Sequence, residues 1–151
     1  GGNVRITLSR HENADKDSLD SAISKEDEMI LSGYNKMNEF ILNWKESKHD
    51  ELSYLCNKYN VAGKAFPGRA AILIKLLNLN EGTIEKEFEK PSSPKIGNYI
   101  PATRIGIYSD YELFKSDNKY DYIINFAWHI KNEVTNYLKD NKIDSKVIHI
   151  L

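Results

Sequence analysis

The feature that most constrains this 151-residue chain is an alternation of short apolar segments with helical segments from residue 59 onward. Apolar segments of strand length occur at 59–63, 83–89, 104–108, 120–127 and 146–151. The spacing of apolar residues between them predicts helices at 70–78 and 129–140, and a capped helical turn at 109–115. Strands that alternate with helices form a parallel sheet. The sequence therefore predicts an α/β domain with a mostly parallel sheet and helices on both faces.

A different pattern precedes this domain. Residues 3–9 alternate apolar and polar side chains, as a half-buried strand does. Apolar residues then recur at helical spacing from Leu19 to about Tyr59, with Gly33 as a predicted break. After that break, an apolar stripe is formed by Tyr34, Met37, Ile41 and Trp44. We expect a strand over 1–10, a helical appendage over 11–58 and the sheet domain over 59–151.

Composition narrows the function classes. The 21 basic and 22 acidic side chains give a formal charge of −1, without the basic excess of a nucleic-acid-binding protein. Cys56 is the only cysteine, so the chain has neither an internal disulfide nor a cysteine cluster for zinc. No apolar run approaches the roughly 20 residues that span a bilayer. We expect a cytoplasmic protein with no nucleic-acid or membrane partner, no metal ligands and no catalytic residues of its own.

The first candidate site is the turn between the segments 59–63 and 70–78. It contains Gly63, Lys64, Pro67, Gly68 and Arg69. A helix that begins there offers unpaired N–H groups and a positive dipole end to a phosphate, and the basic side chains add charge. The turn lacks the GxGxxG and Walker sequences, so an ordinary strand-to-helix turn remains an alternative.

Two other places are candidates. The loop 90–103 is long and irregular, and Tyr99, Thr103 and Arg104 in and beside it supply an aromatic ring, a hydroxyl and a cation. Trp128 and His129 follow the apolar segment 120–127, at the strand edge where α/β sheets bind ligands. The alternatives are a connector held extended by prolines and a structural histidine.

Four segments, taken in order, resemble the S-adenosylmethionine-dependent sugar C-methyltransferase family. They are GGNVRITLSR (1–10), VAGKAFPGRAAILIKLL (61–77), EKPSSPKIGNYIPATRIGI (89–107) and YDYIINFAWHIKNEV (120–134). The chain departs from the family pattern at Ala65, Ala70 and Ala102, where the family has glycines.

The resemblance implies a Rossmann-like carboxyl-terminal domain that holds a nucleotide-diphosphate sugar, with a deoxysugar as the methylated group. The S-adenosylmethionine site, the zinc and the acid/base residues would belong to an upstream domain of the parent protein, which would be this domain's partner. No cofactor is then expected in this chain, and the chain alone should be inactive. The turn 63–69 would take the diphosphate, while residues 99–104 and Trp128-His129 would line the sugar or base.

Two alternatives remain. A non-catalytic interaction or scaffold domain would use the helical segment 19–59 as its partner surface. Burial of the stripe Tyr34, Met37, Ile41 and Trp44 would weaken that alternative, and exposure would strengthen it. A dinucleotide-binding oxidoreductase fragment ranks last, because Glu85, Glu87 and Glu89 only loosely match the acidic residue that such a site needs.

Overall fold

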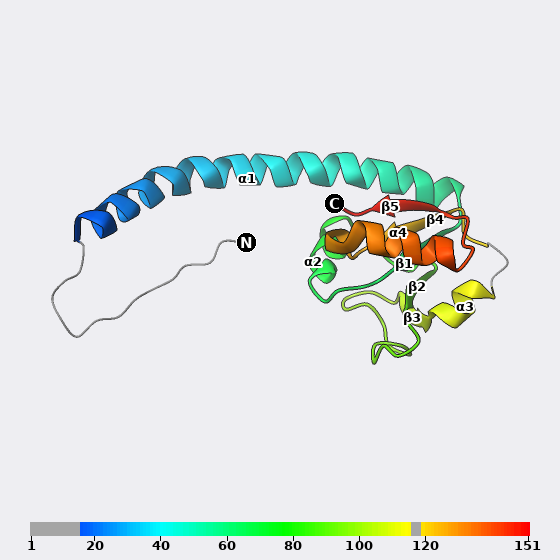
Figure 1. The fold of residues 1–151 in the computed structure, drawn as a ribbon. Helices are drawn as coiled ribbons and strands as arrows, with labels where there is room; N and C mark the ends of the chain where they lie inside the picture. The colour runs from blue at the N-terminus through cyan, green and yellow to red at the C-terminus, as the bar shows by residue number, and fades with distance from the viewer. Residues whose placement is uncertain (1–15, 116–118) are drawn as a thin grey trace. The chain divides into compact units, whose positions relative to one another are not determined.

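The computed structural model describes residues 16–115 and 119–151; the strand predicted within 1–10 lies outside them. Within the described residues, five strands form one sheet in the order β3-β2-β1-β4-β5 (Figure 1). Their bounds are β1 (Val61–Lys64), β2 (Lys86–Glu89), β3 (Gly106–Ser109), β4 (Tyr122–Asn125) and β5 (Lys146–His149). All four strand pairs are parallel. The predicted α/β, Rossmann-like sheet is confirmed, with each strand shorter than its apolar segment.

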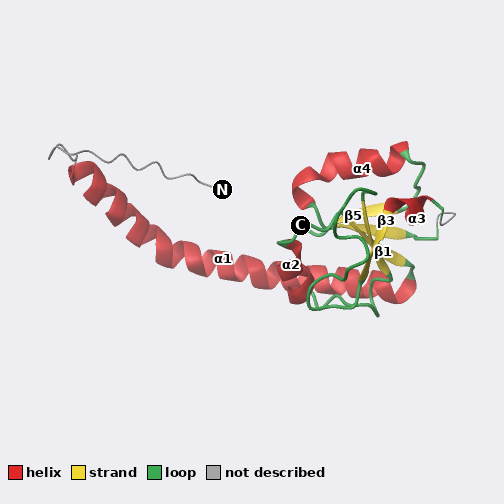
Figure 2. Ribbon diagram, turned by 90° about the horizontal axis from the view of Figure 1, so that it is seen from below, coloured by secondary structure: helices red, strands yellow, loops and turns green. Residues whose placement is uncertain are grey.

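Helices cover both faces of this sheet (Figure 2). The helix α2 (Ala70–Leu76) packs on one face, where Ile74 joins Val61, Ile107 and Phe126 in a buried cluster. The helices α3 (Asp110–Phe114) and α4 (Lys131–Asp140) contribute to a second cluster, formed by residues that include Ala62, Phe88, Leu113, Ile123, Val134 and Leu138. The alternation along each strand explains this division, because successive side chains point to opposite faces.

The segments that follow β3, β4 and β2 differ in structure. Ser109 caps α3 as predicted, since its hydroxyl accepts a hydrogen bond from the N–H of Tyr111. A 3-10 turn, η1 (Trp128–Ile130), separates β4 from α4. The connection between β2 and β3 contains no helix, and part of it runs antiparallel beside β3 through a bridge between Tyr99 and Gly106.

The segment 16–58 forms one continuous helix, α1 (Lys16–Lys58), so the predicted break at Gly33 is wrong. A glycine within a helix costs only about 1 kcal/mol relative to alanine, which the Leu, Met, Lys and Glu residues elsewhere in the segment 16–58 outweigh. Residue contacts divide the chain into two compact units, one ending at Asn43 and one beginning at Trp44. We describe each by itself.

The predicted apolar stripe on α1 is largely exposed. Tyr34, Met37 and Ile41 are 61%, 53% and 36% exposed. Trp44 differs, because it is half-buried against the core of the sheet unit and its indole N–H donates to the carbonyl of Ile150 at 3.3 Å. None of the helices in the ranges 16–115 and 119–151 is both long and apolar enough to cross a membrane.

Candidate functional site

The order in which strands are added to the sheet reverses between the neighbouring parallel strands β1 and β4. From β1 the chain moves to β2 and β3 on one side, and it then returns to β4 and β5 on the other. The loops that follow β1 and β4 therefore leave the sheet in opposite directions and flank a crevice at its carboxyl edge. Ligands of open parallel sheets bind at this point. The predicted turn 63–69 and the predicted pair Trp128-His129 follow these two strands.

The structure brings Arg69, Trp128 and His129 together. The guanidinium carbon of Arg69 lies 5.5 Å from the centroid of the Trp128 ring, and the ring of His129 meets that of Trp128 edge-on at 5.8 Å. Arg69 and His129 are exposed, and Trp128 is half-buried. A cation held over an aromatic face provides both charge and a flat apolar surface for a ligand. This cluster can bind an anionic group that carries a ring.

The backbone of the turn is already hydrogen-bonded. The N–H of Ala65, whose φ is +60°, donates to the carbonyl of Phe88. The N–H of Phe66 donates to one carboxylate oxygen of Glu87 and one of Glu89, each at 3.0 Å. Two carboxylates thus lie where a phosphate would have approached that amide. The diphosphate role expected of the turn would therefore rest on the side chain of Arg69.

Pro67 and Gly68 belong to the tight turn that starts α2. Their carbonyls, with that of Arg69, accept hydrogen bonds from the first three amides of the helix. A Cβ built on Gly68 would have no atom within 4 Å in the structure, so packing does not require glycine there. Gly63 differs, because a Cβ there would lie 2.5 Å from the ring of Phe126. Gly63 therefore has a packing role inside the sheet.

Lys64 is the second cation of the predicted turn, and its surroundings were not predicted. Its side chain is 2% exposed, and its ammonium group lies 3.1 Å from Oδ1 of Asp110, whose side chain is fully buried. The hydroxyl of Tyr137 donates to Oδ2 of Asp110 at 2.8 Å. Burial, followed by the hydrogen bond to Asp110, raises the pKa of Tyr137, so this hydroxyl keeps its proton.

Glu87 is another buried charge-bearing group that the sequence interpretation missed. Burial, strengthened by the nearby charge of Glu89, raises its pKa to about 8. Its Oε2 has no hydrogen-bond partner among the residues that the structure describes. Its neighbour Glu89 is held by Lys95, whose ammonium lies 2.8 Å from Oε1 and also donates to the carbonyl of Phe66. The two glutamates and Lys95 fix the turn in place.

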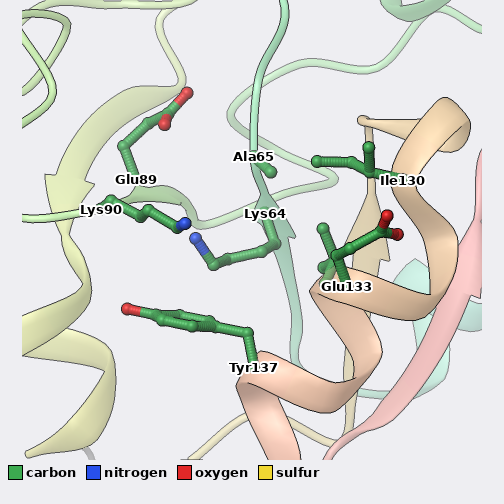
Figure 3. Close-up of a pocket in the computed structure, with 8 residues that line it drawn as sticks. Lys64, Ala65, Glu89, Lys90, Ile130, Glu133 and Tyr137 are labelled. Atoms are coloured by element: carbon green, nitrogen blue, oxygen red, sulfur yellow. The ribbon is translucent and has the colours of Figure 1, made fainter.

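A cavity of about 280 Å³ opens at this edge, between the ends of β1 and β2 and the helix α4 (Figure 3). Lys64 and Ala65 line it from β1 and its turn, and Lys90 lines it from the end of β2. Its remaining lining residues are Glu89, Ile130, Glu133, Val134 and Tyr137. Charged side chains of both signs and an apolar wall therefore meet in one space.

The structure does not bring the other predicted site residues to this edge. Thr103 and Arg104 precede β3, and so lie near the amino ends of the strands, where the N–H of Arg104 donates to Glu81. Tyr99 is 64% exposed beside β3. Sequence could not place them, because the course of a long loop without a helix depends on contacts such as that with Glu81.

A search for metal-ligand clusters found none formed by three or more His, Cys, Asp or Glu side chains in the described part of the chain. Comparison with curated proteins gave no match. A family model described as the C-methyltransferase C-terminal domain matches residues 1–149. This match covers nearly the whole chain and agrees with the order of the four segments noted above. The chain therefore belongs to the C-methyltransferase C-terminal domain family.

Proposed function

We propose that this domain binds a nucleotide-diphosphate sugar for an S-adenosylmethionine-dependent C-methyltransferase, with a deoxysugar as the group to be methylated. The methyl donor and the zinc would be bound upstream in the parent protein. The observation that carries the proposal is the Arg69–Trp128 pair at the point where the strand order reverses. Its guanidinium matches a diphosphate oxygen, and its indole face matches a nucleobase or sugar ring.

This proposal assigns Arg69 a direct role and gives the backbone amide of Phe66 none, since carboxylates already bind that amide. His129 lies beside Trp128 and is exposed, which places a second hydrogen-bonding group at the same crevice. Tyr99, Thr103 and Arg104 would contact only a part of the ligand that extends beyond this crevice.

The test is a calorimetric titration of the chain with nucleotide-sugars, nucleoside diphosphates and S-adenosylmethionine. We expect binding of the nucleotide-sugars, no binding of S-adenosylmethionine, and an affinity about tenfold lower for Arg69→Ala, since an exposed charged contact of this kind is worth about 1 kcal/mol or more. Lys75→Ala is the matched control, because Lys75 is an exposed cation in the last turn of the same helix. Equal affinity of Arg69→Ala and wild type would refute the role of Arg69.

The exposed stripe on α1 favours a second candidate function, that of an interaction domain. Tyr34, Met37 and Ile41 lie on one helical face and remain uncovered. Large apolar side chains in a row on a protein surface mark interaction sites. The two functions are compatible, since the stripe and the Arg69–Trp128 pair are on different units of the chain.

A further inference from the structure

The cavity between β1, β2 and α4 holds a second group of charges, separate from the Arg69–Trp128 pair. Two lysines reach it from neighbouring strands: Lys64 is the last residue of β1, and Lys90 follows the last residue of β2. Figure 3 shows both side chains pointing toward the same region above the ring of Tyr137. The ammonium of Lys64 lies 5.2 Å from the centroid of that ring, and the ammonium of Lys90 lies 5.4 Å from it.

The charged side chains that line this cavity are of both signs, and they differ in whether they have a partner within the protein. Asp110 pairs with Lys64, and Glu89 pairs with Lys95. Within the ranges 16–115 and 119–151, no carboxylate lies within ion-pair distance of Lys90. The ammonium of Lys64 is shared between Asp110 and the carbonyl of Phe88, to which it donates at 3.3 Å. The ammonium of Lys90 is therefore the cation of this cavity that an incoming anion can pair with, beside the third N–H of Lys64.

The energetic cost of burying the charge of Lys64 also favours a ligand at this cavity. A buried ion pair loses the hydration of both charges, and packing by apolar residues of similar size often gives equal or greater stability. Here the pair Lys64–Asp110 is almost fully buried, yet its cation lines a cavity instead of being enclosed by the core. Charged groups kept in such a place at the carboxyl edge of a parallel sheet are typical of binding sites.

The hydrogen bond from Tyr137 to Asp110 supports the same arrangement. By donating to Oδ2, the hydroxyl leaves Oδ1 for Lys64 and fixes the ring beneath the two ammonium groups. The attraction between the ring face and each cation holds both lysines in position. The ring is thus a platform for the cations, and its hydroxyl is already engaged.

We propose that Lys64 and Lys90 form an oxyanion site for a phosphate monoester on a hydroxylated carbon chain or ring. The ammonium groups would bind the phosphate oxygens. The carboxylates of Glu89 and Glu133 line the same cavity and would accept hydrogen bonds from hydroxyl groups of the ligand. Ala65, Ile130 and Val134 supply the apolar wall that the ring carbons of a sugar would contact. A cavity of about 280 Å³ is large enough for a sugar phosphate.

The test is a titration of isotopically labelled chain with glucose 1-phosphate, inorganic phosphate and glucose, followed by nuclear magnetic resonance. We expect millimolar or tighter binding of the two phosphates, no binding of glucose, and signal changes centred on Tyr137 and Lys90. Lys90→Gln should weaken glucose 1-phosphate binding at least tenfold without unfolding the chain, because Lys90 is exposed. Lys139→Gln is the control. Lys139 is an exposed cation on α4, the helix that forms one wall of the cavity, but its own side chain does not line the cavity.

Equal binding by Lys90→Gln and wild type, or signal changes confined to residues away from Tyr137, would overturn this site. Absence of any phosphate binding would overturn it as well. Arg69→Ala separates this site from the proposed function, because it should weaken nucleotide-sugars and leave glucose 1-phosphate unchanged. The nucleotide-sugar proposal can therefore fail while the phosphate site stands, and the reverse also holds.

Discussion

Glu87 shows how one buried residue makes the stability of the fold depend on pH. Its pKa is about 8 in the folded chain, against an ordinary value of 4.5. The folded state therefore holds a proton that the unfolded chain releases between these two values. Stability from this group is complete below about pH 4.5 and is lost progressively as the pH rises toward 8.

We expect Glu87→Gln to remove this dependence. The amide carbonyl can still accept the hydrogen bond from Phe66, and no charge is buried. The free energy of unfolding should exceed that of wild type by about 1–3 kcal/mol above about pH 8, with the difference shrinking toward pH 5. Denaturant unfolding at several pH values measures it. Glu85→Gln, at an exposed carboxylate, is the control; a difference for Glu87→Gln that is independent of pH would contradict the assignment.

The limits of sequence interpretation are clearest at single residues. Arg69 and Trp128 lie far apart in the sequence, yet their proximity was foreseeable, because both follow strands that end at the same edge. Asp110 and Tyr137 were not foreseeable. In the sequence, Asp110 is indistinguishable from any acidic residue in the first turn of a capped helix, and Tyr137 is indistinguishable from the other residues of an apolar helix face. Only the packing of α3 beside α4 reveals that they hold Lys64.

At the scale of elements, two glycines give opposite predictions for the same substitution. Gly33 lies within α1 with no atom within 4 Å of a built Cβ. We expect Gly33→Ala to stabilise α1 by about 1 kcal/mol, because alanine restricts the unfolded chain and favours the helix. Gly63→Ala should destabilise the sheet unit by about 1–3 kcal/mol, since the new methyl group would meet the ring of Phe126 at 2.5 Å.

Circular dichroism and hydrogen exchange distinguish these two effects. Gly33→Ala should slow exchange within α1 and leave β1 unchanged, whereas Gly63→Ala should accelerate exchange in β1 and β4. Slower exchange in β1 of Gly63→Ala would contradict the packing role of this glycine. The wrong prediction at Gly33 has the same origin, because the sequence alone does not distinguish a glycine that ends a helix from one that lies within a continuous helix.

Sheet and loops differed in how well the sequence predicted them. Each strand and its following helix carry a periodic apolar pattern that local rules detect, so the parallel sheet could be predicted. The connection between β2 and β3 carries no such pattern. Its position beside β3 is set by contacts such as that of Gly97 with Ile107, whose carbonyl accepts the glycine N–H. Loop 90–103 could be predicted to exist, but its course could not.

At the scale of the whole molecule, the apolar face of α1 raises the question of what covers it. The side chains concerned lie at helical spacing and are exposed: Leu19, Ile23, Ile30, Tyr34, Met37 and Ile41. The same stripe continues along the helix to Trp44, Leu52 and Leu55, which pack within the sheet unit. A helical stripe of apolar side chains that is buried at one end and exposed at the other indicates that the exposed part is an interaction surface.

We expect a second copy of the chain to cover this face in solution. Complete covering of these side chains, with Met29 and Phe40 at their border, would bury on the order of 800 Å² per copy, which is the share of one partner in an interface of standard size. Sedimentation velocity should show dimers that dissociate on dilution. Ile30→Glu should give monomers, because it places a charge within the stripe, whereas Asn35→Glu on the opposite helical face should leave the dimer intact. A wild-type chain that stays monomeric at the highest attainable concentration would rule out this pairing, and the interaction function would then lose its simplest partner.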